Sequence, residues 1–115
     1  MRTWTDDARD HARLILQAAL EAVTPKVVMR PLRVEDGHLL LPDGRRVRVE
    51  GRTLRLVAVG KAAGGMAAQG QRWGKYAEAV VVAPYDAGIP EYECLVGDHP
   101  VPTERSVRAG ERALD

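Results

Sequence analysis

The stretch that decides the fold is Leu56-Val57-Ala58-Val59-Gly60-Lys61-Ala62-Ala63-Gly64-Gly65-Met66. Its first four residues form a continuous apolar run, which is typical of a β-strand covered on both faces. Gly60 permits a tight turn, and residues 62–73 are compatible with a helix that stops near Gly74. A second apolar run follows over residues 79–83. The interval between the two runs is long enough for a crossover helix, so the pattern predicts a β-α-β unit.

The region beyond the second run predicts a third strand and a last helix. A loop over residues 84–91, rich in proline and glycine, leads to the apolar run 94–96. This loop is short for a parallel crossover, which usually needs a dozen or more residues, so a parallel and an antiparallel third strand both stay open. Thr103 can then cap a helix that reaches toward Leu114.

The residues before the β-α-β unit predict one helix and a small β appendage. Apolar side chains recur at three- and four-residue steps over residues 6–23, with Thr5 or Asp6 as the cap and Pro25 as the stop. Residues 27–51 alternate apolar and polar side chains between glycine-containing turns, which predicts a hairpin or meander. The expected fold class is therefore α/β, with a Rossmann-like, mostly parallel sheet flanked by helices and a small β-hairpin or meander appendage.

Length and composition restrict the class of protein. The 115 residues, 45% hydrophobic and 29% charged, predict one globular domain over residues 1–115. A net charge of +1 gives no reason to expect nucleic acid or an anionic membrane as partner. No secretory signal or membrane-length apolar run occurs, so we expect a soluble, cytoplasmic protein. The lone Cys94 cannot form an internal disulfide and is interpreted as a small hydrophobic residue.

The turn Gly60-Lys61-Ala62 is the first candidate binding site. Free backbone N–H groups and the helix dipole favour an anion at the start of a helix, and Lys61 adds a full positive charge. The segment matches neither G-x-x-x-x-G-K-[ST] nor G-x-G-x-x-G. Local features alone leave two readings open, an anion site and a tight turn with a solvated lysine.

The loop Gly97-Asp98-His99-Pro100-Val101-Pro102-Thr103 is the second candidate site. Two prolines stiffen it, and His99 can bind an anion or carry a proton near neutral pH. The alternative is a loop histidine that hydrogen-bonds only locally. His11 and His38 have no ligand-like spacing to His99, so no metal-ligating residues are assigned. Asp86 follows the second apolar run. It either faces the same cleft as these two segments or is a solvated turn residue, and the turn interpretation is favoured.

Several motifs in this order resemble the glycerate 2-kinase family, whose members carry a C-terminal MOFRL domain and were often labelled hydroxypyruvate reductases. The matching segments, over about residues 5–115, are Leu56-Val57-Ala58-Val59-Gly60-Lys61-Ala62-Ala63, Met66-Ala67, Val80-Val81-Val82 and His99-Pro100-Val101-Pro102. The family's Gly-Lys-Ala lysine is an active-site residue and matches Lys61. The histidine of its His-Pro loop, which borders the same cleft, matches His99.

The resemblance implies an enzyme that transfers the γ-phosphoryl group of ATP to the 2-hydroxyl of D-glycerate, with Mg²⁺. The implied site is Lys61 as catalytic residue, with Gly60, Lys61, Ala62 and His99 binding the substrate anion. The chain departs from the family at Asp98, where glycine is usual, and at Thr103, where aspartate is usual. It matches only the N-terminal portion of these longer enzymes, so the C-terminal domain is expected to be absent and isolated activity weak or nil.

Two other functions are weighed beside the kinase fragment. The first is a non-catalytic α/β module that self-associates or docks on a companion chain, because an incomplete domain exposes apolar surface. The second is a small-anion-binding protein built around Lys61.

Overall fold

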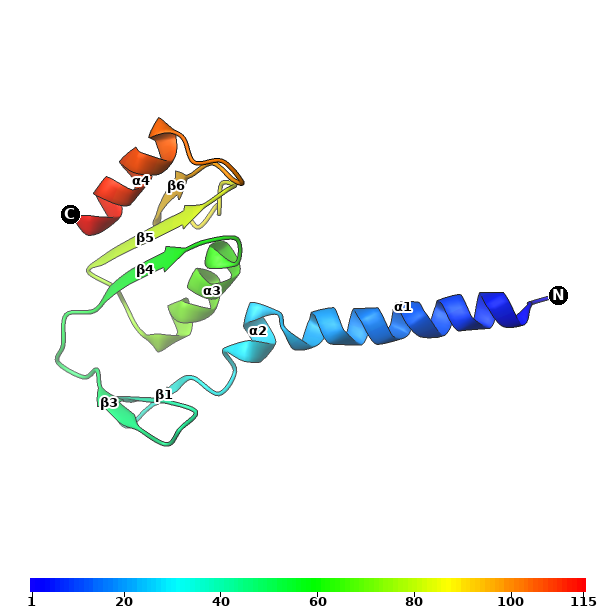
Figure 1. The fold of residues 1–115 in the computed structure, drawn as a ribbon. Helices are drawn as coiled ribbons and strands as arrows, with labels where there is room; N and C mark the ends of the chain where they lie inside the picture. Colours follow the sequence, from blue (N-terminus) through cyan, green and yellow to red (C-terminus); the bar gives the residue numbers. More distant parts are fainter.

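The computed structural model of residues 1–115 contains two three-stranded sheets and four α-helices (Figure 1). The helices are α1 (Trp4–Ala22), α2 (Pro25–Val28), α3 (Ala63–Gly70) and α4 (Glu104–Leu114), with a 3-10 turn, η1 (Gln71–Trp73), after α3. The strands are β1 (Arg33–Glu35), β2 (His38–Leu40), β3 (Arg46–Arg48), β4 (Arg55–Val59), β5 (Glu78–Ala83) and β6 (Glu93–Val96). The α/β class and the β appendage are as predicted.

The β-α-β unit lies at the centre of the body. β4 and β6 both pair in parallel with β5, in the order β4-β5-β6, with Val57 opposite Val80 and Val81 opposite Cys94. The crossover helix α3 lies on one face of this sheet, and α4 covers β5 and β6 on the other (Figure 1). The appendage is an antiparallel meander in the order β1-β2-β3.

The third strand of the main sheet is parallel, although the loop before it is short. Residues 84–92 make the crossover without a helix. An extended chain advances about 3.3 Å per residue against 1.5 Å in a helix, so fewer residues are needed to return to the start of the sheet. Ile89 from this loop is buried in the core and takes the place of a covering helix.

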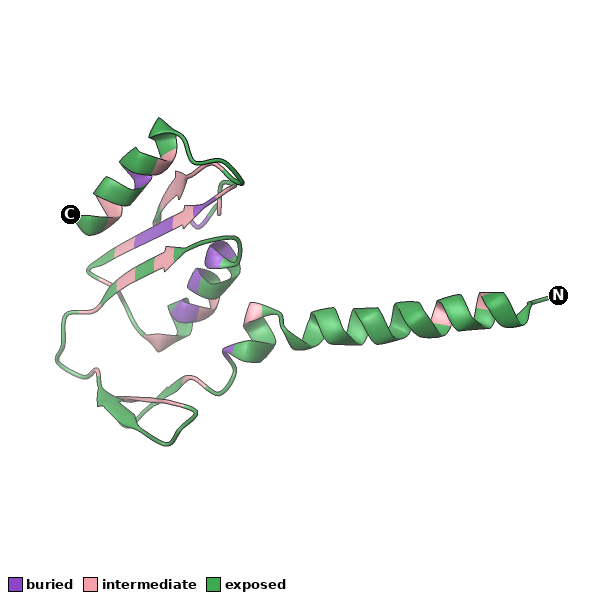
Figure 2. Ribbon diagram, viewed as in Figure 1, coloured by how far each residue is buried: buried purple, intermediate pink, exposed green.

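The core lies between α3, this loop and one face of the sheet (Figure 2). Ala63 and Ala67 place the α3 backbone close to Val81 and Ala83 of β5, because their short side chains allow a close approach. Leu56, Ala58 and Cys94 pack against the same cluster while only partly buried, which fits the interpretation of Cys94 as a small hydrophobic residue.

The expectation that the run 56–59 is covered on both faces is wrong for this chain. β4 is an edge strand, and the side chains that point away from α3 are open to solvent, with Val57 59% and Val59 69% exposed. α4 does not reach them, because it packs over β5 and β6. The central strand β5 has the expected burial on both faces, at Val80 and Val81.

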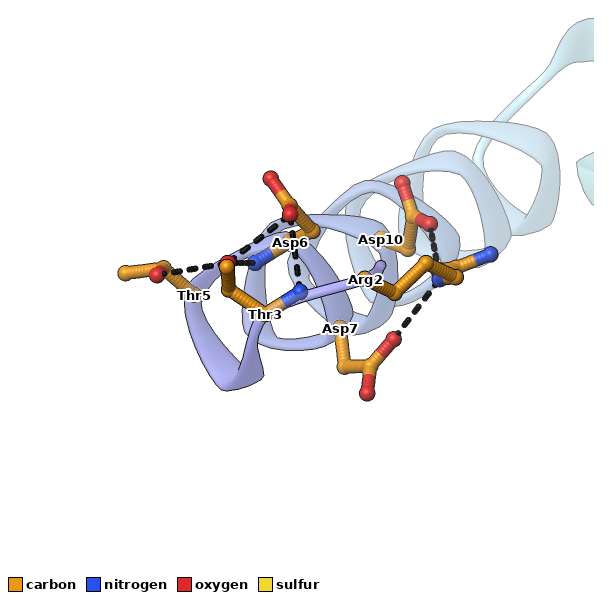
Figure 3. A network of polar contacts seen from close by, with 6 residues as sticks. All are labelled: Arg2, Thr3, Thr5, Asp6, Asp7 and Asp10. Carbon is orange, nitrogen blue, oxygen red and sulfur yellow. Dashed lines mark hydrogen bonds and ion pairs between the residues drawn. The ribbon is translucent and has the colours of Figure 1, made fainter.

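Helix α1 begins two residues earlier than predicted, because its cap is Thr3 rather than Thr5 or Asp6. Thr3 Oγ1 accepts a hydrogen bond from the Asp6 amide at 3.3 Å, and the Asp6 carboxylate accepts one from the Thr3 amide at 3.0 Å (Figure 3). The bond from the Thr3 amide, followed by one that the Thr3 hydroxyl donates to the same carboxylate at 2.8 Å, holds the pKa of Asp6 below its ordinary value. Arg2 forms ion pairs with Asp7 and Asp10 beside them. α1 ends at Ala22, ahead of Pro25 as predicted, and Pro25 then begins α2.

Two hydrogen bonds from η1 join the appendage to the body. The Trp73 indole N–H donates to the Leu32 carbonyl at 3.2 Å, and the Arg72 guanidinium donates to the Met29 carbonyl at 2.9 Å. No helix of the structure combines the length and apolarity needed to cross a lipid bilayer.

Val81 gives a direct test of this core. Its side chain is 0% exposed at the centre of the sheet, so Val81→Ala should lower the free energy of unfolding by about 2 kcal/mol through lost burial and a small cavity. Urea denaturation measures the change. The matched control is Val101→Ala, at a loop residue 71% exposed, which should change stability by less than about 0.5 kcal/mol. Equal effects of both substitutions would contradict the assigned core.

Candidate functional site

A cavity of about 370 Å³ opens at the carboxyl ends of β4, β5 and β6, on the face that carries α4. It brings Gly60 and Lys61 together with His99, which lies far from them in the sequence. The remaining lining residues are Val59, Val82, Ala83, Pro84, Gly97, Asp98, Pro102, Ser106, Gly110 and Ala113. Ala62, also predicted as a binding residue, is exposed beside the cavity as the N-cap of α3 and does not line it.

Gly60 turns the chain from β4 into α3. Its amide donates to the Val82 carbonyl at 2.9 Å and so extends the parallel ladder, and its φ of +116° is a conformation that favours glycine. No side chain caps α3. The first N–H groups of a helix lack intrahelical acceptors, so this turn offers backbone donors to an anion or to water.

Tyr85 holds this turn from the loop that follows β5. Its hydroxyl donates to the Lys61 carbonyl at 2.7 Å, and its ring lies against Gly64, where an added Cβ would come within 3.2 Å of the Tyr85 Oη. This role of Tyr85 has little signature in the sequence, where the only signal is its position just after the apolar run of β5. Its neighbour Asp86 accepts from the Gly88 amide at 2.9 Å and does not line the cavity, as the turn interpretation predicts.

The His99 loop is tied to the first turn of α4. The Ser106 hydroxyl accepts hydrogen bonds from the Asp98 amide at 2.8 Å and from the Thr103 amide at 3.3 Å. The Asp98 carboxylate in turn accepts from the Thr103 hydroxyl and from the Arg105 guanidinium. These contacts fix both ends of the loop, while His99 itself is exposed at the cavity rim.

The charge of Asp98 is compensated within this cluster. Hydrogen bonds from Arg105 and then from Thr103 hold the pKa of Asp98 below its ordinary value, and the same pairing raises the pKa of Arg105. The two departures from the glycerate kinase pattern, Asp98 and Thr103, therefore contact each other. Lys61 takes part in none of the ion pairs of the chain, so it contributes the uncompensated cation of the cavity.

The pKa of Asp98 gives a test of this cluster. Carbon-detected NMR should find the pKa of Asp98 below the ordinary aspartate value of about 3.9, and Arg105→Gln should raise it toward that value. Because the folded-state pKa is the lower one, the pair stabilises the fold fully above that ordinary value. The stabilisation is lost as the pH falls through the folded-state pKa.

The control for this titration is Arg108→Gln, which removes a neighbouring cation that pairs with Glu104 instead. This substitution should leave the pKa of Asp98 unchanged. An Asp98 pKa that is insensitive to the loss of Arg105 would show that the pair does not form in solution.

Comparison with known proteins identifies a family and a solved structure of similar fold. A family described as "Domain of unknown function (DUF4147)" matches residues 11–115. The crystal structure of the PH0495 protein from Pyrococcus horikoshii OT3 superposes with a TM-score of 0.75 over 93% of this chain, at 24% sequence identity. The chain spans 25% of that protein's length. No curated protein gives a significant match.

Proposed function

Because the chain belongs to the DUF4147 family, whose domain is the N-terminal domain of MOFRL-associated glycerate-kinase-type proteins, we propose that it is the anion-binding part of a glycerate 2-kinase. In this proposal the cavity binds the carboxylate of D-glycerate or the phosphoryl group that is transferred to its 2-hydroxyl. Lys61 supplies the positive charge, and His99 positions the bound anion.

Lys61 and His99 line the same cavity, and this arrangement is the main support for the proposal. The cavity lies at the carboxyl ends of parallel strands, where open α/β sheets bind their ligands. A lysine without an acidic partner, at the start of an uncapped helix, favours an anion over a neutral ligand. Asp98 does not oppose this preference, because Arg105 compensates its charge.

The chemistry that these residues supply is charge neutralisation and positioning. Phosphoryl transfer depends mainly on both, because negative charge lies on the transferred oxygens in the transition state. Lys61 offers a mobile ammonium group. The His99 imidazole, held by a loop anchored at both ends, offers a ring N–H that can donate to an anion oxygen.

We propose that ATP and Mg²⁺ are not fully bound by this chain alone. No three His, Cys, Asp or Glu side chains come together in a group that would hold a metal ion, and neither common phosphate-binding fingerprint occurs. We therefore assign no step to the metal here and expect the isolated chain to bind an anion without efficient turnover.

Anion binding by Lys61 is the first test of the function. Isothermal titration with D-glycerate and with inorganic phosphate should give binding that weakens at least about tenfold in Lys61→Ala, because a charge-assisted contact of roughly 1.5–3 kcal/mol is lost. Lys61→Arg should retain part of it. The matched control is Lys75→Ala, since Lys75 lies outside this cavity. Equal binding by the Lys61→Ala and unsubstituted chains would refute the site.

Turnover is the second test. A coupled assay of ADP release with D-glycerate, ATP and Mg²⁺ should show little or no activity for the isolated chain. Robust turnover that disappears in Lys61→Ala would contradict the view that this chain holds only part of the active site. The titration and the assay are separable, because anion binding does not require ATP.

A further inference from the structure

The polar side chains that line the cavity are few, namely Lys61, Asp98, His99 and Ser106. Lys61 and His99 belong to the proposed function, and the Asp98 carboxylate is occupied by Arg105 and Thr103. Ser106 anchors the His99 loop by accepting two amide hydrogen bonds. Its hydroxyl group has a further capacity that the loop does not use.

The unused capacity is the hydroxyl proton. A serine hydroxyl offers one donated proton and two acceptor lone pairs. Both lone pairs of Ser106 Oγ are occupied, because the oxygen accepts from the Asp98 amide at 2.8 Å and from the Thr103 amide at 3.3 Å. No group of the chain accepts a hydrogen bond from this hydroxyl, which takes part in these two bonds alone. The proton is therefore available to a partner outside the chain.

The nearby hydroxyl of Thr103 differs in this respect. It donates to the Asp98 carboxylate, and its oxygen accepts from the Arg105 amide at 3.2 Å. The Thr103 proton is thus used within the chain, and Thr103 does not line the cavity. Of the two hydroxyl groups at the start of α4, only that of Ser106 keeps a donor available at the cavity.

Ser106 lies over the carboxyl ends of β5 and β6. A Cβ built on Gly97 would be 3.7 Å from Ser106 Oγ and 3.6 Å from Val82 Cγ1, and all three residues line the cavity. The other cavity residues of α4, Gly110 and Ala113, have no polar side chain. Ser106 is partly buried, and a hydrogen bond formed away from bulk water is electrostatically stronger than one formed in it. The α4 wall therefore has one side-chain donor, the Ser106 hydroxyl.

We propose that Ser106 is a direct ligand of the anion, and that its hydroxyl donates to one anion oxygen while the Lys61 ammonium contacts another. This inference rests on the proposed function, because it requires an anion in the cavity. With both lone pairs held by amides, the hydroxyl cannot receive a hydrogen bond from a substrate hydroxyl. The contact therefore selects a carboxylate or phosphoryl group, which has at least two acceptor oxygens.

Isothermal titration of the full chain with inorganic phosphate tests this contact. We expect Ser106→Ala to weaken phosphate binding at least about tenfold, because a hydrogen bond to a charged group is lost. Ser106→Thr keeps the hydroxyl and should stay within about threefold of the unsubstituted chain. The matched control is Thr103→Ala, which loosens the same loop without removing a donor from the cavity and should also stay within about threefold. Equal losses in Ser106→Ala and Thr103→Ala would overturn the proposal.

A double-mutant cycle separates a direct ligand from an anchor of the loop. If Ser106 acted only by positioning His99, its substitution would have no effect once His99→Ala had removed the imidazole. A direct ligand predicts that Ser106→Ala weakens phosphate binding about tenfold in the His99→Ala chain as well. Disappearance of the effect in that chain would show that Ser106 only positions the loop.

An NMR titration of the unsubstituted chain tests the contact without any substitution. A hydroxyl that donates a hydrogen bond becomes a stronger acceptor, so the Asp98 amide proton should move downfield as phosphate binds. An Asp98 amide signal that stays in place at saturating phosphate would contradict the contact.

The failure of this contact is distinguishable from the failure of the proposed function. Phosphate binding that depends on Lys61 but not on Ser106 would overturn the Ser106 contact alone. Phosphate binding that depends on neither residue, or no phosphate binding at all, would overturn both.

Discussion

The parallel pairing of β5 with a strand on each side is the constraint on which the rest of the body depends. It places the ends of β4, β5 and β6 at one edge, where the Gly60 turn and the His99 loop leave the sheet. The ladder continues beyond the strands through the Gly60 and Gly97 amides, which donate to carbonyls of Val82 and Ala83. Backbone hydrogen bonds to β5 therefore fix where each candidate segment leaves the sheet, independently of any side chain.

Side chains then restrain the two segments in different ways. Tyr85 fixes the backbone of Lys61 but leaves its ammonium group free to move, whereas Ser106 and the Asp98 carboxylate anchor the loop around His99 from both ends. Both residues line the same cavity, and we propose that Lys61 captures a small anion that His99 then orients. The arrangement also explains how an acidic residue is accommodated at the rim, since Arg105 compensates it.

Sequence reasoning recovered the features that have local causes. Apolar runs and a glycine turn predicted the β-α-β unit. The placement of His99 in the same cleft as Lys61 came from the family resemblance, because the direction of the third strand was left open. Sequence reasoning failed where contacts between segments far apart in the sequence decide the structure. An apolar run such as 56–59 cannot reveal that its strand lies at an edge, and loop length alone could not foresee that Ile89 would replace a covering helix. Tyr85 was missed because its partner is a backbone carbonyl, which leaves no trace in residue identity.

The attachment of the appendage through η1 has a spectroscopic consequence. The chain contains only two tryptophans, and each reports on a different part of the molecule. Trp73 is partly shielded and donates its indole N–H to Leu32, so its emission depends on the meander remaining attached. Trp4 lies at the far end of α1 in contact with water. Blue and red components of the intrinsic fluorescence thus separate the state of the body from that of the projecting helix, without any added label.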